Sequence, residues 1–78
     1  MTVPNAKDLA IDAKLGAKLK AARLAAGLDP FEAAAKLRCS KPHVIGLENG
    51  HHRPSIKLLA RMAKVYGTKL FILMDGIQ

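Results

Sequence analysis

The sequence predicts a small all-α domain, and three observations carry that prediction. Apolar residues recur at helical spacing along most of the 78-residue chain. Residues that begin or end helices, namely Gly, Pro, Ser and Asp, divide the chain into short segments. Half of the residues are apolar and only 4% are aromatic, so we expect one domain with a core of Leu, Ile, Val and Ala.

The first helix is expected from about residue 12 to residue 26. Gly27 follows it as a C-terminal stop. Residues 1–11 are expected to form a flexible N-terminal arm, and residues 12–78 the folded domain. The apolar face of this helix consists of residues at positions i, i+4, i+7 and i+11: Leu15, Leu19, Ala22 and Ala26.

Two short helices, residues 30–37 and 41–49, are expected next. Asp29 can cap the first of them together with Glu32, and Ser40 can cap the second; each also has a proline in its first turn, where proline is tolerated. Only three residues separate the two helices, which is typical of a helix-turn-helix motif. The inner face of the first is Ala33, Ala34 and Leu37.

A fourth helix is expected over residues 56–66, after Pro54-Ser55 and before Gly67. Its buried stripe consists of Leu58, Leu59, Met62, Ala63 and Tyr66. The last segment, residues 68–74, contains five consecutive apolar residues and fits a short helix or a strand about equally by periodicity. We favour the helix.

The positive charge is concentrated in the second half of the chain. The net charge is +7, and residues 33–74 account for all of it, because they hold eight basic residues and one acid, Glu48 (8 − 1 = +7). The basic residues are Lys36, Arg38, Lys41, Arg53, Lys57, Arg61, Lys64 and Lys69. This favours a polyanionic partner, with nucleic acid ahead of a membrane surface, over charge that serves only solubility.

Length, cysteine content and hydropathy exclude several classes of protein. A 78-residue chain is too short for a multidomain enzyme, and a single cysteine, Cys39, cannot form a disulfide framework. The longest apolar run, residues 70–74, is far shorter than a membrane span, and the N-terminus lacks the pattern of a signal peptide. We therefore expect a cytoplasmic protein with no membrane association.

The spacing of these residues resembles the Cro/cI-type, lambda-repressor-like helix-turn-helix family of phage and bacterial regulators. The resemblance covers about residues 15–74, and its most specific part is Glu48-Asn49-Gly50 followed by Arg53-Pro54-Ser55. The other matching residues are Leu15-Gly16, Leu19, Arg23, Gly27-Leu28, Ala34, Leu37, Val44, Leu47, Leu58-Leu59, Ala63 and Tyr66-Gly67.

The resemblance implies a five-helix domain whose third helix enters the major groove of DNA, usually as a symmetric dimer. The residues that would contact bases are Lys41, Pro42, His43 and Gly46. The residues that would contact phosphates are Lys36, Arg38, Asn49, His51, His52 and Arg53. The resemblance also implies a partly buried ion pair between Arg23 and Glu48 that would join the first helix to the third.

The chain departs from this family where DNA contacts are expected. Pro30 replaces a glutamine that normally donates to a phosphate, and the side chains of Pro42 and Gly46 cannot form hydrogen bonds. Gly46 is also unusual inside a helix, where it costs about 1 kcal/mol relative to Ala, unless another group approaches closely. Base reading would then depend on Lys41 and His43, with apolar contact from Val44 or Ile45, so we expect modest specificity unless DNA shape or dimer avidity adds to it.

Two other features have simpler interpretations. Cys39 and the three histidines could suggest a metal site, but a lone cysteine at this turn fits a small core residue better, so we expect no metal, no cofactor and no enzymatic activity. The apolar segment near the C-terminus is expected to form a dimer interface: Leu70, Phe71, Ile72, Leu73 and Met74.

The sequence therefore predicts a sequence-specific regulator of transcription that binds double-stranded DNA as a homodimer. We expect it to act as a repressor in the bacterial cytoplasm, at the nucleoid. The alternative is an antitoxin-type module that regulates its own expression by DNA binding and has a toxin or a co-regulator as its protein partner.

Overall fold

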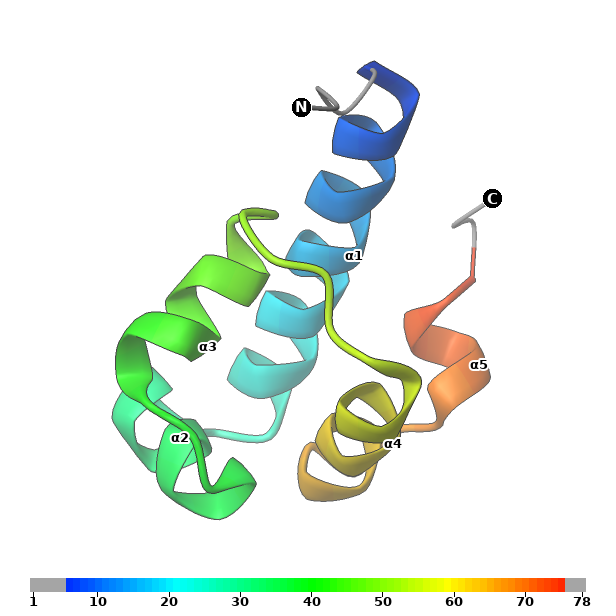
Figure 1. The fold of residues 1–78 in the computed structure, drawn as a ribbon. Helices are drawn as coiled ribbons and strands as arrows, with labels where there is room; N and C mark the ends of the chain where they lie inside the picture. The colour runs from blue at the N-terminus through cyan, green and yellow to red at the C-terminus, as the bar shows by residue number, and fades with distance from the viewer. Residues whose placement is uncertain (1–5, 76–78) are drawn as a thin grey trace.

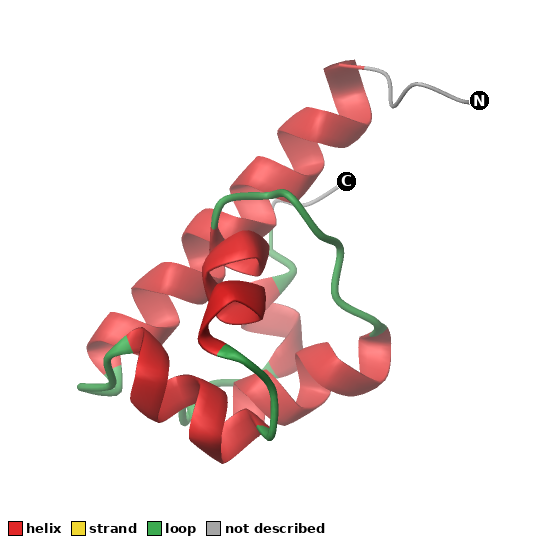
Figure 2. Ribbon diagram, turned by 60° about the vertical axis from the view of Figure 1, so that its left-hand side comes forward, coloured by secondary structure: helices red, strands yellow, loops and turns green. Residues whose placement is uncertain are grey.

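Within its described residues the chain forms five α-helices, and Figure 1 shows them in a computed structural model. The structure describes residues 6–75, and their side chains from residue 12 onward. The helices are α1 (Ala6–Ala25), α2 (Pro30–Leu37), α3 (Lys41–Glu48), α4 (Ile56–Val65) and α5 (Leu70–Leu73). All regular structure within the described residues is helical, so the segment over residues 68–74 contains a helix and not a strand. The longest loop between these helices, residues 49–55, connects α3 to α4 (Figure 2).

The first helix begins earlier than the sequence analysis placed it. It starts at Ala6 instead of residue 12, so part of the expected N-terminal arm is helical, while residues 1–5 lie outside the described residues. The segment over residues 6–11 contains neither Gly nor Pro, so nothing in it ends a helix. At the other end, Ala26 follows the helix and is exposed, so it does not belong to the apolar face.

The core contains leucine and alanine, as expected, but no isoleucine from the described part of the chain. Ile45, Ile56 and Ile72 are exposed, whereas Met62 and Tyr66 are buried. The buried apolar residues are Leu15, Leu19, Ala33, Ala34, Leu37, Val44, Leu47, Leu59, Met62, Ala63, Tyr66 and Leu73. Helices α1 to α4 supply most of this core, so α2 and α3 are held as one packed unit against α1 and α4.

A close approach between α1 and the C-terminal end of α3 depends on Gly16. A Cβ atom at this position would collide with the backbone oxygens of Leu47 and Glu48. Gly50, which directly follows the C-cap of α3, has a φ of +77° and lies against the backbone of Ala13. These two glycines allow α3 to end directly against α1.

The helix-turn-helix segment is defined by its caps. Asp29 and Glu32 form the expected capping box at α2. The backbone N–H of Glu32 donates to Oδ1 of Asp29 at 2.7 Å, and the backbone N–H of Asp29 donates to Oε1 of Glu32 at 3.1 Å. Ser40 Oγ accepts from the backbone N–H of His43 at the start of α3. Between these helices Arg38 adopts a left-handed conformation, with φ of +58°, that few residues other than glycine favour. The turn therefore has the expected length, and its first residue, the C-cap of α2, is strained.

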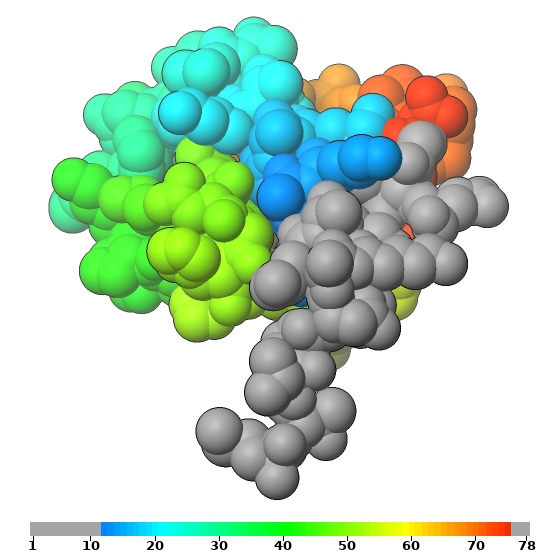
Figure 3. Space-filling model, turned by 90° about the horizontal axis from the view of Figure 1, so that it is seen from above, coloured from blue at the N-terminus to red at the C-terminus, as the bar shows by residue number. Residues whose placement is uncertain are grey.

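The two surfaces of functional interest lie on different sides of α1. In Figure 3 the segment from α2 through the loop after α3 lies to one side of α1, and α5 lies to the other. Figure 1 shows the same separation. None of the helices in the described part of the chain is long and apolar enough to cross a membrane.

Candidate nucleic-acid interface

Three of the first five side chains of α3 are exposed to solvent. Lys41 and Pro42 are exposed, and His43 is partly exposed. Ile45 is also exposed, whereas Val44 is fully buried in the core. Of the two apolar side chains considered for contact with a thymine methyl group, only Ile45 is therefore available. Lys41, Pro42 and Ile45, with the partly exposed His43, thus form a surface of mixed chemistry on α3.

Gly46 is not part of that surface, because the ring of His52 covers it. Gly46 is buried, and a Cβ atom there would lie 2.5 Å from Cδ2 and 2.8 Å from Nε2 of His52. The His52 ring also stacks on the ring of His43, with centroids 5.6 Å apart and planes inclined by 25°. The group that approaches this glycine in the structure is therefore a side chain of the same chain, and the expected contact between Gly46 and a base stays a prediction.

The residues expected to contact phosphates form two groups at the two ends of α3. Lys36 and Arg38 are exposed near its N-terminal end, and Asn49 and His51 are exposed after its C-terminal end. An eight-residue helix is roughly 12 Å long, which is about the width of the major groove. Cations and hydrogen-bond donors thus flank the exposed surface of α3, an arrangement that fits the two phosphate backbones bordering one groove.

Arg53 has a second role that the sequence did not reveal. Its Nε donates to Oδ1 of Asp12 at 2.8 Å, and the Arg53 side chain remains 57% exposed. This ion pair ties the loop after α3 to α1. Asp12 and Arg53 are 41 residues apart, so no local pattern could indicate the contact. The loop that carries His51 and His52 is therefore held at both α3 and α1.

A buried ion pair fixes the end of α3 to α1. Arg23 donates to both carboxylate oxygens of Glu48, from Nε at 2.6 Å and from Nη2 at 3.1 Å. Its Nη1 also donates to the carbonyl of Leu28 at 2.8 Å. Arg23 and Glu48 are only 5% and 8% exposed, so the pair that the resemblance implies is formed and is more deeply buried than expected.

This ion pair also changes the electrostatics of the core. The hydrogen bond to Glu48 raises the pKa of Arg23 above its ordinary value. Burial, together with the nearby Glu48 carboxylate, raises the pKa of Tyr66 to about 12. The Tyr66 hydroxyl has no hydrogen-bond partner among the described residues. The Arg23–Glu48 pair thus holds α3 in position, and the neighbouring phenol stays neutral.

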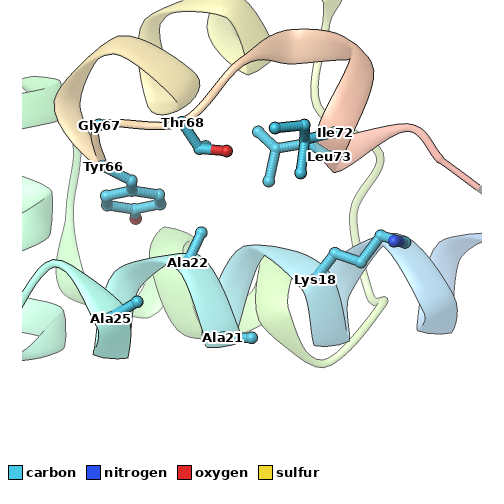
Figure 4. Close-up of a pocket in the computed structure, with 9 residues that line it drawn as sticks. All are labelled: Lys18, Ala21, Ala22, Ala25, Tyr66, Gly67, Thr68, Ile72 and Leu73. Atoms are coloured by element: carbon cyan, nitrogen blue, oxygen red, sulfur yellow. The ribbon is translucent and has the colours of Figure 1, made fainter.

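A second surface is formed by α5 and the facing part of α1. Phe71, Ile72 and Met74 are 69%, 48% and 38% exposed. Leu70 is partly buried, and Leu73 is 2% exposed and belongs to the core, so Leu73 is not available to a partner. Figure 4 shows the adjacent pocket of about 530 Å³, which is lined by Lys18, Ala21, Ala22, Ala25, Tyr66, Gly67, Thr68, Ile72 and Leu73. This surface is apolar and separate from α3.

Comparison with known proteins supports the geometric interpretation. The family model of the helix-turn-helix domain matches residues 14–70. A crystal structure of the clp gene regulator ClgR from Corynebacterium glutamicum is 28% identical, covers 82% of this chain and 83% of its own, and has a TM-score of 0.77. A second ClgR crystal structure from the same organism is also 28% identical, covers 82% of this chain and 68% of its own, and has a TM-score of 0.78.

No curated protein matches the chain. The family match covers most of the residues, and the likeness to ClgR covers 82% of this chain. The fold is all-α and lambda-repressor-like, with α2 and α3 as the helix-turn-helix. The chain therefore belongs to the helix-turn-helix domain family of the Cro/cI type, and it is a DNA-binding regulator of transcription.

Proposed function

We propose that this protein is a repressor-like regulator that reads a specific site in double-stranded DNA as a homodimer, with α3 in the major groove. The observation that supports this most strongly is the exposure of Lys41, Pro42 and Ile45 on α3, between two groups of side chains expected to contact phosphates. The Arg23–Glu48 ion pair adds the rigidity that a reading helix needs. The clp gene regulator ClgR, a similar protein, is described as a regulator of genes.

Base reading in this proposal depends on a short set of side chains. Lys41 is exposed at the start of α3 and can donate to O6 and N7 of guanine, the two acceptors of that base in the major groove. Ile45 can contact the methyl group of thymine. Each such contact supplies about 1–3 kcal/mol of discrimination. With two or three contacts per protomer, specificity depends on the dimer binding two half-sites.

The affinity is expected to come largely from phosphates. Each protomer has three exposed cations that are candidates for phosphate contact, namely Lys36, Arg38 and Arg53, and we expect two or three of them to bind. Each phosphate neutralised adds about −0.9 to the slope of log K against log salt, so a dimer should show a slope of roughly −4 to −5. Between 50 and 200 mM salt the affinity should therefore fall by about 10²- to 10³-fold.

The α5 surface is the proposed dimer interface, formed by Leu70, Phe71, Ile72 and Met74. Three of these side chains are exposed in the isolated chain, and one of them, Ile72, also lines the pocket between α5 and α1. Because α5 and α3 lie on different sides of α1, a two-fold axis near α5 leaves both copies of α3 free to contact DNA (Figure 3).

A salt titration tests the proposal. Fluorescence anisotropy with a labelled random-sequence duplex should give the slope stated above, and a duplex selected by the protein should bind more tightly at every salt concentration. A slope near zero would rule out DNA binding. If the salt slope is as expected but no duplex is preferred, the protein binds DNA without sequence specificity, and the proposed base reading is contradicted.

A further inference from the structure

The ring of His52 lies against α3, in the space that a side chain at Gly46 would fill. Glycine is the least favourable residue after proline inside a helix, and Gly46 lies in the middle of α3. The space that a side chain at residue 46 would fill contains the His52 ring, whose Cδ2 and Nε2 lie 2.5 and 2.8 Å from the position of an added Cβ. Any larger residue at 46 would displace that ring.

His43 holds the same ring from a second direction. Its imidazole stacks on that of His52 at 5.6 Å between centroids. Residues 43 and 46 are three positions apart, so they share one face of the helix. The backbone of His43 is in turn fixed by its hydrogen bond to Ser40 Oγ. The His52 ring is thus placed on a defined face of α3, although its own backbone belongs to the loop after the helix.

Besides His43 and Gly46, this face carries Pro42, another residue that the resemblance places at the bases. Pro42 lies four positions before Gly46 and is exposed. Lys41 lies five positions before Gly46, so its side chain is on a different side of α3. His52 remains exposed while one side of its ring is against α3. The loop is held by the ion pair between Arg53 and Asp12, so His52 is not carried by a freely moving segment. The exposed edge of the ring therefore lies on the face of α3 that carries Pro42 and Gly46.

We propose that His52 contacts a base, and that Gly46 and His43 are positioning residues for it. This inference depends on the proposed DNA-binding function and changes the role of His52 from phosphate contact to base contact. An imidazole carries at least one N–H donor in each of its protonation states. Guanine presents two acceptors, O6 and N7, in the major groove. His52 thus supplies the side chain that Gly46 lacks, and it favours guanine at one position of each half-site.

The experiment compares His52→Ala, Gly46→Ala and the double variant on duplexes that vary at each base pair of the selected site. His52→Ala should lose the guanine preference at one position by roughly 5- to 150-fold, with little change on random duplex. Gly46→Ala should lose the same preference, and the double variant should lose no more than either single variant. Without DNA, the His52 ring protons should shift in NMR spectra of Gly46→Ala.

His51→Ala is the matched control, because His51 is the adjacent exposed histidine of the same loop. It should weaken selected and random duplexes equally. Alanine favours helix formation at residue 46, and melting curves of Gly46→Ala should show a folded protein. If this variant melts early, the comparison of His52→Ala with His43→Ala provides the same test, since both variants should lose preference at the same base pair.

Two results would overturn the inference. An equal loss on both duplexes for His52→Ala would make His52 a phosphate contact, and independent losses that multiply in the double variant would show that Gly46 does not act through His52. If the unmodified protein binds DNA with the expected salt slope while these variants keep its base preference, only this inference fails. If it shows no salt-dependent binding, the proposed function fails and this inference fails with it.

Discussion

Replacement of Arg23 by methionine should destabilise the protein more than any surface substitution. The Arg23 guanidinium makes three hydrogen bonds, two to Glu48 and one to the carbonyl of Leu28, and it is 5% exposed. Methionine fills much of the same volume but leaves the Glu48 carboxylate buried without its partner. Breaking a buried ion pair in this way costs about 3–5 kcal/mol.

This loss is large relative to the total stability. A domain of this size has a free energy of unfolding of about 4–12 kcal/mol, and each kcal/mol shifts its melting temperature by about 4–8 °C. Arg23→Met should therefore lower the melting temperature by at least about 12 °C. Affinity for DNA should fall as well, because the pair holds the C-terminal end of α3 against α1.

Thermal melting by circular dichroism measures this effect, with Lys20→Met as the matched control. Lys20 is an exposed lysine on the same helix, so its replacement should change stability by no more than about 0.5 kcal/mol. A second variant, Arg23→Met combined with Glu48→Leu, should recover part of the loss, since it removes both charges. If Arg23→Met melts within the same range as Lys20→Met, the pair does not fix α3 and the reasoning is wrong.

Three further predictions follow from single residues. Arg38→Gly should raise the free energy of unfolding by about 0.5–1 kcal/mol, because glycine adopts the φ of +58° without strain. It should also weaken DNA binding and make the salt dependence of binding shallower. Unchanged stability would show that the turn is not strained. Phe71→Lys should shift sedimentation equilibrium toward monomer, whereas Phe31→Lys, at an equally exposed phenylalanine on α2, should not; equal effects would place the dimer interface elsewhere. Burial raises the pKa of Tyr66 from 10.0 to about 12, so the stability that the neutral phenol contributes is complete below pH 10 and is lost as the pH rises toward 12, by roughly 2–3 kcal/mol in total. Tyr66→Phe should abolish that decline in urea unfolding at pH 9–12 and should cost little stability at pH 7. An identical decline in both proteins would refute the assignment.

Local patterns predicted the parts of the fold that local chemistry determines. The capping box of Asp29 and Glu32 and the cap at Ser40 are formed, because a cap involves residues only three positions apart. The start of α1 was placed too late because a helix was sought from its apolar face, and residues 6–11 extend the helix beyond the predicted face. Periodicity identifies the buried part of a helix and says little about where its end lies.

The site was predicted less completely, because its contacts join distant segments. The resemblance implied the Arg23–Glu48 pair from conserved spacing within a family pattern, and the structure contains it. The pair of Asp12 and Arg53 had no such pattern to indicate it. The sequence showed that Gly46 needs a close neighbour but not that His52 is that neighbour. The choice between a stand-alone regulator and an antitoxin-type module stays a prediction, as does the dimer.

The central claim is that α3 reads bases while the residues at its ends hold phosphates. The most direct measurement compares Lys41→Ala with Lys36→Ala on a duplex selected by the unmodified protein and on random duplex. Lys41→Ala should lower the affinity for the selected duplex by roughly 5- to 150-fold and the affinity for random duplex little, whereas Lys36→Ala should lower both affinities equally. If Lys41→Ala lowers the affinity for both duplexes equally, Lys41 binds a phosphate, and the claim that α3 reads bases through Lys41 is contradicted.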